Sequence, residues 1–256
     1  MKKLAFIVPA FRRFDLTRAC LTQLRRTCVA LGNEQIQATA VVIGDDANLD
    51  VAELLGFATV RQDNQPLGRK WNDGIEYATA YLGCDYVVPF GTDNWIDPDL
   101  AVWLPPDDSI LAHRQCTLVH ESGEKMVALN VSYDGGDGIR CLPAPLLEVL
   151  NFRPCDEDRA RATDTSMRDR LARRLGKRPR FVYVDLHPLQ IVSFQSPEQQ
   201  LNGYEELKGA FGTFERTDPW VQLAKVYSDQ AVAEVREVFA RRSGGPVSGA
   251  SVGAAA

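Results

Sequence analysis

The chain has 256 residues, of which 45% are hydrophobic and 25% charged, and its formal net charge is −5. This is the composition of an ordinary globular protein, and its charge excludes a general attraction to nucleic acid or anionic lipid. No apolar stretch has the length of a membrane span or of a signal peptide. The six cysteines include no C-x-x-C pair, so we expect reduced thiols in a cytoplasmic protein.

Strand and helix patterns alternate over the first hundred residues. Apolar runs predict strands over 4–8, 39–43, 58–61 and 85–90, and helical spacing predicts helices over 15–31, 51–57 and 70–82. Asp15 is the expected N-cap of the first helix, and Gly32 is its expected stop. This alternation predicts an α/β fold with a mostly parallel sheet, and such sheets bind ligands beyond the carboxyl ends of their strands.

Polar residues follow each of these four predicted strands. In chain order, the polar residues that follow the strands are Arg12 and Arg13, Asp45 and Asp46, Asn64, and Thr92, Asp93 and Asn94. Because the carboxyl ends of parallel strands share one edge, we expect a binding site along that edge.

The second half has a different pattern. It predicts a hairpin of strands 109–119 and 125–131, a glycine-rich loop over 133–139, a strand over 181–185, and helices over 146–150, 164–175 and 220–242. We divide the chain into a donor-side half (1–104), an acceptor-side α+β half of the same domain (105–242), and a disordered tail (243–256) that is rich in Gly, Ser and Ala.

Four segments of the first half resemble the family 2 glycosyltransferases, which have the Rossmann-like GT-A fold. In chain order they are 6–13 (FIVPAFRR), 41–46 (VVIGDD), 64–68 with 72–75 (NQPLG, NDGI), and 85–94 (DYVVPFGTDN) with Pro98. In the second half, 164–171 (DTSMRDRL) and 185–187 (DLH) are similar to the family's late helix and strand. The resemblance implies a GT-A fold and transfer of a sugar from a nucleoside-diphosphate donor.

The sequence departs from the family pattern at three positions. Gly91 replaces the first carboxylate of the family's D-x-D motif, Thr163 replaces a glutamate, and Trp71 replaces an arginine. These departures concern the metal shell and the contacts with the donor base.

The resemblance implies a set of donor-binding residues at the strand ends. They are Pro9, Phe11, Arg13, Asp45, Asp46, Asn64, Gly68, Asn72 and Thr92. A carboxylate after the second strand can accept a hydrogen bond from the imide N–H of a uracil-like or guanine-like base. A UDP-sugar is the favoured donor. The alternative for Asp45 and Asp46 is a loop or N-cap role, and the alternative for Arg12 or Arg13 is a solvated surface charge.

Asp93 is the expected carboxylate ligand of Mn²⁺ or Mg²⁺, on an exposed strand end, and His187 is a further candidate ligand. One protein carboxylate can suffice for such an ion, since phosphates and water complete its shell. The alternatives are a turn or capping role for Asp93 and an ordinary hydrogen-bonded histidine at 187.

Asp164 is the candidate general base, because it begins a helix where the dipole favours its ionised form. An N-cap role is the alternative, and Asp134 and Asp137 are the next candidate bases. The run from Arg168 to Arg180 is basic, which is compatible with a nucleic-acid acceptor or with a solvated helix face.

Three functions remain open at this point. An inverting glycosyltransferase is favoured. A nucleotidyltransferase requires a glycine-rich phosphate loop after the first strand, where this chain has Pro9, Ala10 and Phe11. A nucleotide-sugar-binding protein without turnover is suggested by Gly91 alone. The acceptor stays open among a saccharide, a lipid-linked sugar, a protein side chain and a modified nucleic acid.

Overall fold

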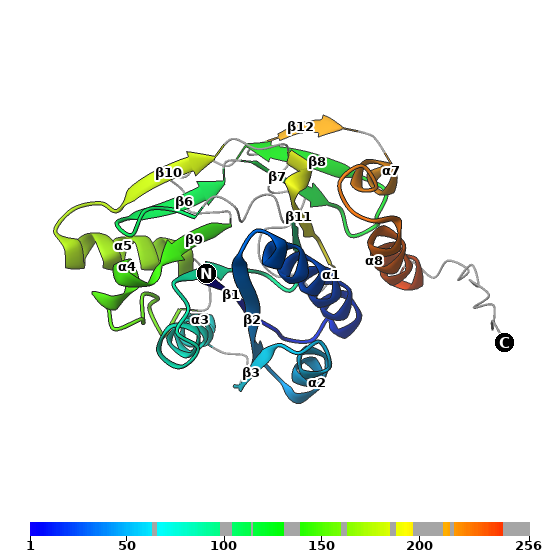
Figure 1. The fold of residues 1–256 in the computed structure, drawn as a ribbon. Helices are drawn as coiled ribbons and strands as arrows, with labels where there is room; N and C mark the ends of the chain where they lie inside the picture. The colour runs from blue at the N-terminus through cyan, green and yellow to red at the C-terminus, as the bar shows by residue number, and fades with distance from the viewer. Residues whose placement is uncertain are drawn as a thin grey trace.

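The computed structural model describes residues 1–62, 66–97, 104–113, 115–130, 139–159, 163–184, 188–196, 212–215 and 218–242. Two β-sheets and the helices around them form the fold (Figure 1). The strands are β1 Lys2–Pro9, β2 Ile36–Gly44, β3 Ala58–Arg61, β4 Tyr86–Pro89, β5 Asn94–Ile96, β6 Ser109–His113, β7 Gln115–Val119, β8 Met126–Asn130, β9 Arg140–Pro143, β10 Arg180–Val184, β11 Ile191–Phe194 and β12 Gly212–Glu215. The α-helices are α1 Phe14–Asn33, α2 Asp46–Leu54, α3 Leu67–Glu76, α4 Ala144–Glu148, α5 Thr163–Leu175, α7 Pro219–Leu223 and α8 Asp229–Arg242.

The larger sheet has seven strands in the order β10-β6-β9-β4-β1-β2-β3. β1 pairs in parallel with β2 and β4, and β10 pairs in parallel with β6, whereas β9 is antiparallel to both of its neighbours. The sheet is therefore mixed but mostly parallel, as predicted. It takes four strands from residues 1–104 and three from 105–242, so both halves build it.

The smaller sheet has five strands in the order β12-β8-β7-β11-β5. Its apolar side packs with α8 and the start of α1 in one cluster that includes Trp95, Phe194 and Val235. β5 directly follows the end of β4, so the smaller sheet begins where the larger sheet's carboxyl edge lies.

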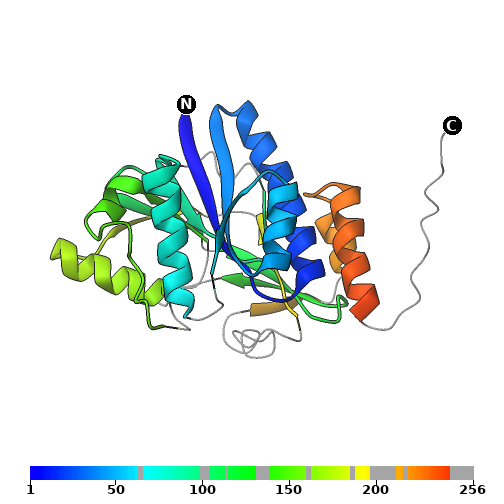
Figure 2. The same cartoon turned by 90° about the horizontal axis from the view of Figure 1, so that it is seen from below.

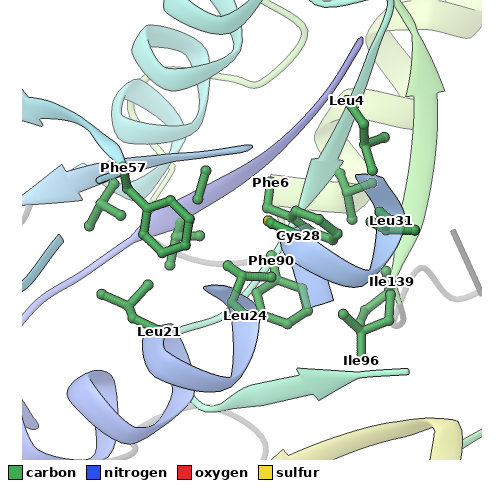
Figure 3. Packing of buried hydrophobic residues seen from close by; sticks show 14 of the residues in the cluster. Leu4, Phe6, Leu21, Leu24, Cys28, Leu31, Phe57, Phe90, Ile96 and Ile139 are labelled. Carbon is green, nitrogen blue, oxygen red and sulfur yellow. The ribbon is translucent and has the colours of Figure 1, made fainter. Parts of the chain in front are cut away.

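The core of the larger sheet follows from the apolar run in β1, whose residues from Leu4 to Val8 are fully buried. Leu4, Phe6 and Val8 face the cluster formed with α1 and α2, and Ala5 and Ile7 face the cluster formed with α3, α4 and α5. Figure 3 shows Leu4 and Phe6 among the α1 side chains. Each large apolar side chain buried in this way contributes about 1.5–3 kcal/mol.

Several predicted boundaries were wrong in the first half. α1 follows Arg13 rather than a capping Asp15, and it continues past Gly32 to Asn33. The helix predicted over 51–57 spans 46–54 instead, because the Asp45 side chain caps it by accepting a hydrogen bond from the Asn48 backbone N–H. α3 begins earlier than predicted and continues into a π-helical turn over Tyr77–Tyr81.

Two predictions in the second half were also wrong. The strand predicted over 109–119 is two strands, because β6 joins the larger sheet and β7 the smaller one. The helix predicted over 220–242 is α7 and α8, since Ser228 Oγ accepts a hydrogen bond from the Ala231 N–H (3.3 Å) and begins a new helix. The loop predicted over 133–139 lies almost wholly, and the tail predicted over 243–256 wholly, outside the described residues. Among the helices that are described, none is both long and apolar enough to cross a bilayer.

Candidate functional site

The turn between β1 and α1 has a strained backbone. Arg12 and Arg13 are consecutive non-glycine residues with positive φ, at 52° and 46°. Such conformations cost about 1–3 kcal/mol each and persist only where surrounding contacts enforce them. The Asn48 side chain donates a hydrogen bond to the Arg12 carbonyl (3.4 Å), which ties the turn to α2. The turn therefore holds Arg13 in one position at the carboxyl edge of the larger sheet.

Arg13 spans the gap between the ends of β1 and β4. Its Nη1 donates to Asp93 Oδ2 (2.8 Å) and its Nη2 donates to Thr92 Oγ1 (3.0 Å). The side chains of Arg13 and Asp93 are 19% and 10% exposed, so the ion pair is largely buried. The expectation that Asp93 stands on an exposed strand end was therefore wrong. Its carbonyl also accepts from the Phe194 N–H (2.7 Å), which fixes it to β11.

The space at Gly91 is already taken by Asp93. A Cβ at position 91 would lie 2.5 Å from Asp93 Oδ1, which is closer than Cβ atoms come to other atoms. With the Asn94 amide oriented to suit its neighbours, its nitrogen donates to Ser193 Oγ (3.1 Å) and to Asp93 Oδ1 (3.2 Å). Both oxygens of Asp93 thus have donors, and a side chain at position 91 would require the Asp93 and Asn94 side chains to shift.

Asp45 and Asp46 follow β2 at the same edge and have different surroundings. Asp45 Oδ1 accepts from the Asn48 backbone N–H (3.3 Å) and side-chain N–H (2.7 Å), so the capping interpretation of Asp45 is confirmed. Asp46 is exposed and forms an ion pair with Arg61 at the end of β3. Asp46 is thus the more accessible of the two carboxylates for a nucleotide, and its role in donor binding stays a prediction.

Gly68 and Asn72 hold α3 against the segment 155–159. The Gly68 N–H donates to the Arg159 carbonyl (2.9 Å), and a Cβ at this position would lie 1.8 Å from the Asp156 carbonyl oxygen. The buried Asn72 amide donates to the Cys155 carbonyl (3.0 Å) and accepts from its N–H (2.8 Å). These groups already have structural partners. Donor binding by Gly68 and Asn72 stays a prediction, and Asn64 lies outside the described residues.

Lys70 is a residue of this edge that the sequence analysis missed. Its buried Nζ donates to the Ala10 carbonyl (2.9 Å) and lies 5.9 Å from the centre of the Phe11 ring. The Arg12 guanidinium lies 4.8 Å from the centre of the same ring. Phe11 is therefore held by two cations, and Pro9 precedes it at the half-buried end of β1. The sequence did contain a signal for Lys70. It lies one helical turn before Gly74, whose lack of a side chain lets α3 pack closely on Ile7 and Ile43 of the sheet.

The first turns of α5 and α3 both contact the segment at Asp156. Ser166 Oγ accepts a hydrogen bond from the Asp156 N–H (3.1 Å), and Asp156 is the residue packed on Gly68. Asp164 is the second residue of α5, so that helix begins close to the segment at Asp156 that packs on the start of α3. Its catalytic role stays a prediction. Asp134, Asp137 and His187 fall outside the described residues.

Comparison with solved structures places this arrangement among known folds. S. aureus TarS residues 1–349 in complex with UDP matches with a TM-score of 0.52 and 15% identity, covering 77% of this chain and 62% of that one. The same protein in complex with UDP-GlcNAc matches with a TM-score of 0.53 and 13% identity, covering 94% and 73%. This chain has the GT-A fold. A weaker match, at a TM-score of 0.45 and 13% identity over 87% and 73% of the two chains, is a Drosophila β1,4-galactosyltransferase 7 mutant with manganese, UDP-Gal and xylobiose.

No protein-family model matches the chain, and no curated protein matches its sequence. The chain spans less than two thirds of the UDP-bound TarS fragment. The GT-A fold is therefore established from structure alone.

The predicted metal ligands fit a hard divalent cation only in part. Across the residues that the structure describes, no three His, Cys, Asp or Glu side chains gather at one place. Asp93 supplies one carboxylate, and Arg13 already neutralises it. Asp93 alone fits Mn²⁺ or Mg²⁺ if the phosphates of a ligand and water fill the remaining positions.

His113, at the end of β6, is buried on this same edge, and neither of its ring nitrogens has a hydrogen-bond partner among the residues that the structure describes. Burial lowers the pKa of His113 to about 4. The unfolded chain, with a histidine pKa near 6.5, then binds a proton that the folded chain does not. Above about pH 6.5 the imidazole is neutral in both states and does not lower the free energy of unfolding. As the pH falls from 6.5 toward 4, only the unfolded chain takes up the proton, so the free energy of unfolding decreases.

We therefore expect the free energy of unfolding to fall by about 2 kcal/mol between pH 7.5 and pH 5 because of His113. Urea unfolding across this range measures the change. His113→Leu removes the titrating ring and is expected to flatten this part of the profile. An equally steep profile in His113→Leu would show that other groups cause the pH dependence.

Proposed function

We propose that this chain is a glycosyltransferase that transfers a sugar from a nucleoside-diphosphate sugar, with a UDP-sugar favoured, by inverting single displacement. The observation that carries the proposal is the cluster of Arg13, Thr92 and Asp93 at the carboxyl edge of a GT-A sheet. The structural neighbours that were solved with UDP and UDP-GlcNAc support the choice of donor.

Arg13 is suited to the leaving diphosphate. A guanidinium is charged at every physiological pH and presents a planar fork that matches phosphate oxygens. Its position is fixed by the strained turn, by Thr92 and by Asp93, so little conformational entropy is lost when a ligand binds. Charge that develops on the leaving group is best stabilised by such a fixed donor.

We assign the nucleobase of the donor to the end of β2. Asp46 is the exposed carboxylate there, and Asp45 fixes the start of α2. We propose that Asp46 exchanges Arg61 for an imide N–H of uracil, because a carboxylate can only accept hydrogen bonds. Pro9 and Phe11 would form the apolar floor beside the nucleotide, where Lys70 and Arg12 hold the Phe11 ring.

Asp93, with His187, would hold the Mn²⁺ or Mg²⁺ ion. When bound, the cation supplies a further positive charge on the diphosphate. Arg13 contributes positive charge from the chain itself, and its ion pair with Asp93 keeps the carboxylate neutralised before a donor arrives.

The reaction requires a base on the acceptor side. An acceptor hydroxyl oxygen attacks the anomeric carbon, the bond from that carbon to the diphosphate oxygen breaks, and the nucleoside diphosphate leaves with the electron pair. We propose that Asp164 takes the hydroxyl proton. Its placement at the start of α5, next to the segment 156–159 that covers α3, supports this role. The acceptor stays open among a saccharide, a protein and a modified nucleic acid, and cytoplasmic location stays a prediction.

Two alternatives give different results in one assay. A nucleotidyltransferase is disfavoured because the β1–α1 turn is built from Ala10, Phe11, Arg12 and Arg13 instead of glycines. A binding protein without turnover would bind a UDP-sugar and leave it intact. We expect release of UDP from UDP-sugars in the presence of Mn²⁺, by slow hydrolysis without acceptor, measured by a coupled UDP assay. Binding with no UDP release from any UDP-sugar would favour the binding protein.

A further inference from the structure

The β1–α1 turn, which carries Arg13, is held at its start by contacts from β2 and α3. The Ala10 N–H donates to the Ile43 carbonyl (2.7 Å), and Lys70 Nζ donates to the Ala10 carbonyl (2.9 Å). Gly44 lies so close to this carbonyl that a Cβ there would be 2.6 Å from its oxygen. The first half of the turn is therefore fixed before the chain reaches its two arginines.

The second half of the turn is held by Asn48, the third residue of α2. Asn48 Nδ2 donates to the Arg12 carbonyl (3.4 Å) and to Asp45 Oδ1 (2.7 Å). The Arg12 carbonyl belongs to the peptide plane that joins Arg12 to Arg13, the two residues with positive φ. A donor on this carbonyl therefore opposes rotation of the plane toward the less strained conformations that residues other than glycine prefer.

The side chains that hold the turn come from opposite faces of the larger sheet. α1 and α2 pack on one face, and α3 packs on the other (Figures 1 and 2). Asn48 reaches the turn from α2, and Lys70 reaches it from α3. The turn therefore lies between two helices whose own positions are fixed by the core.

The amide hydrogens of Asn48 are its contribution at this position. The side chain is buried, and Nδ2 has acceptors in the Arg12 carbonyl and the Asp45 carboxylate. Its Oδ1 is buried as well and has no donor among the residues that the structure describes. A buried acceptor without a donor costs free energy, so what favours asparagine here is the pair of hydrogen bonds that it donates.

These contacts form a chain of hydrogen bonds along the carboxyl edge. The Asp45 carboxylate after β2 accepts from Asn48, which also donates to the carbonyl that precedes Arg13. Arg13 in turn donates to Thr92 and Asp93 after β4. The chain crosses the ends of β2, β1 and β4, from the strand end assigned to the nucleobase to the arginine assigned to the diphosphate.

We propose that Asn48 is a positioning residue for the donor diphosphate. Asn48 is 1% exposed, so it acts through Arg13, whose guanidinium it keeps where the phosphate oxygens bind. The identity of the ligand rests on the proposed function, whereas the hold on Arg13 is present in the free protein. Without Asn48 the turn relaxes and the ligand has to order Arg13 again, which weakens binding. Uridine has no phosphate for Arg13 and is not affected.

The test is a double-mutant cycle on the full chain with Asn48→Ala, Arg13→Gln and the combined variant. Calorimetry with Mn²⁺ measures the affinity for UDP, and NMR titration measures the affinity for uridine. We expect Asn48→Ala to weaken UDP binding about tenfold, as Arg13→Gln does, and to change uridine binding less than about twofold. The combined variant should bind UDP about as well as either single variant, because both substitutions remove the same contact.

Gln23→Ala is the matched control. Gln23 is also a buried amide whose Oε1 has no described donor, and it lies on α1, about three turns past Arg13. Its UDP affinity should equal that of the unaltered chain. Losses that multiply in the combined variant, equal losses for UDP and uridine in Asn48→Ala, or an equal loss in Gln23→Ala would overturn the proposal.

The stability of the free protein separates this inference from the proposed function. Absence of UDP binding by the unaltered chain would contradict the proposed function, and urea unfolding then decides on Asn48. Asn48→Ala and Arg13→Gln should be non-additive by at least about threefold in the unfolding equilibrium constant, because they interrupt one chain of hydrogen bonds. Additive effects on that constant would overturn the positioning of Arg13 by Asn48, whatever the ligand.

Discussion

Asp164→Asn is expected to leave UDP binding nearly unchanged and to slow sugar transfer by about 10²–10⁴-fold, which is the usual loss when a general base is removed. Asparagine caps helices about as well as aspartate. If Asp164 only capped α5, the same substitution would change neither stability nor rate by much. Initial rates of UDP release with the acceptor at saturation, together with thermal unfolding, measure both quantities.

Asp169→Asn is the matched control for this experiment, because Asp169 is an exposed carboxylate on the same helix and pairs with Arg168. Its transfer rate should equal that of the unaltered chain. Single displacement also requires the anomeric configuration to invert, which NMR of the product reports. Retention of configuration, or full activity in Asp164→Asn, would refute the mechanism and shift attention to Asp134 and Asp137.

Asp93→Asn is expected to lower the transfer rate by about 10²–10³-fold with the fold intact, since it removes the charge of the carboxylate that orients Arg13 and would hold the cation. Asparagine preserves an acceptor for Arg13. Asp93→Ala is a poorer test, because it leaves the largely buried Arg13 without its partner, and breaking a buried pair in this way costs about 3–5 kcal/mol.

Asp85→Asn is the matched control for Asp93. Asp85 precedes the same strand at its opposite end, where its carboxylate accepts from the Lys3 N–H (2.8 Å), so the substitution is chemically identical but lies across the sheet. Activity of Asp93→Asn within a few-fold of the Asp85→Asn activity would mean that Asp93 is not part of the reacting site. A fall in activity equal in both variants would indicate a stability effect.

The parts of the fold that could be predicted from the sequence are those with local signals. The apolar run in β1 and the helical period of α5 are each decided by residues near in sequence, and both elements were predicted within a few residues. The short strands β5, β9, β11 and β12 were missed. They have only three or four residues each, and their pairing partners lie far away in the chain, so no local periodicity indicates them.

The candidate site divides in the same way. The edge that carries Arg13, Thr92, Asp93 and Asp46 followed from strand ends alone. The ion pair of Arg13 with Asp93 joins residues 80 positions apart, and the burial of Asp93 depends on β11, so neither was predictable. The sequence shows Gly91 only as a missing carboxylate, whereas the structure shows that the Asp93 and Asn94 side chains lie where a side chain at position 91 would begin.

The central claim is that the edge formed by β1, β2 and β4 binds a nucleoside diphosphate. Titration calorimetry of the full chain with UDP in the presence of Mn²⁺ tests it most directly. We expect binding at a single site, tighter with Mn²⁺ or Mg²⁺ than without, and weakened by about tenfold or more in Arg13→Gln, because a hydrogen bond to a charged group is worth about 1.5–3 kcal/mol. No heat of binding at millimolar UDP with the metal present, or equal affinity in Arg13→Gln, would contradict the account.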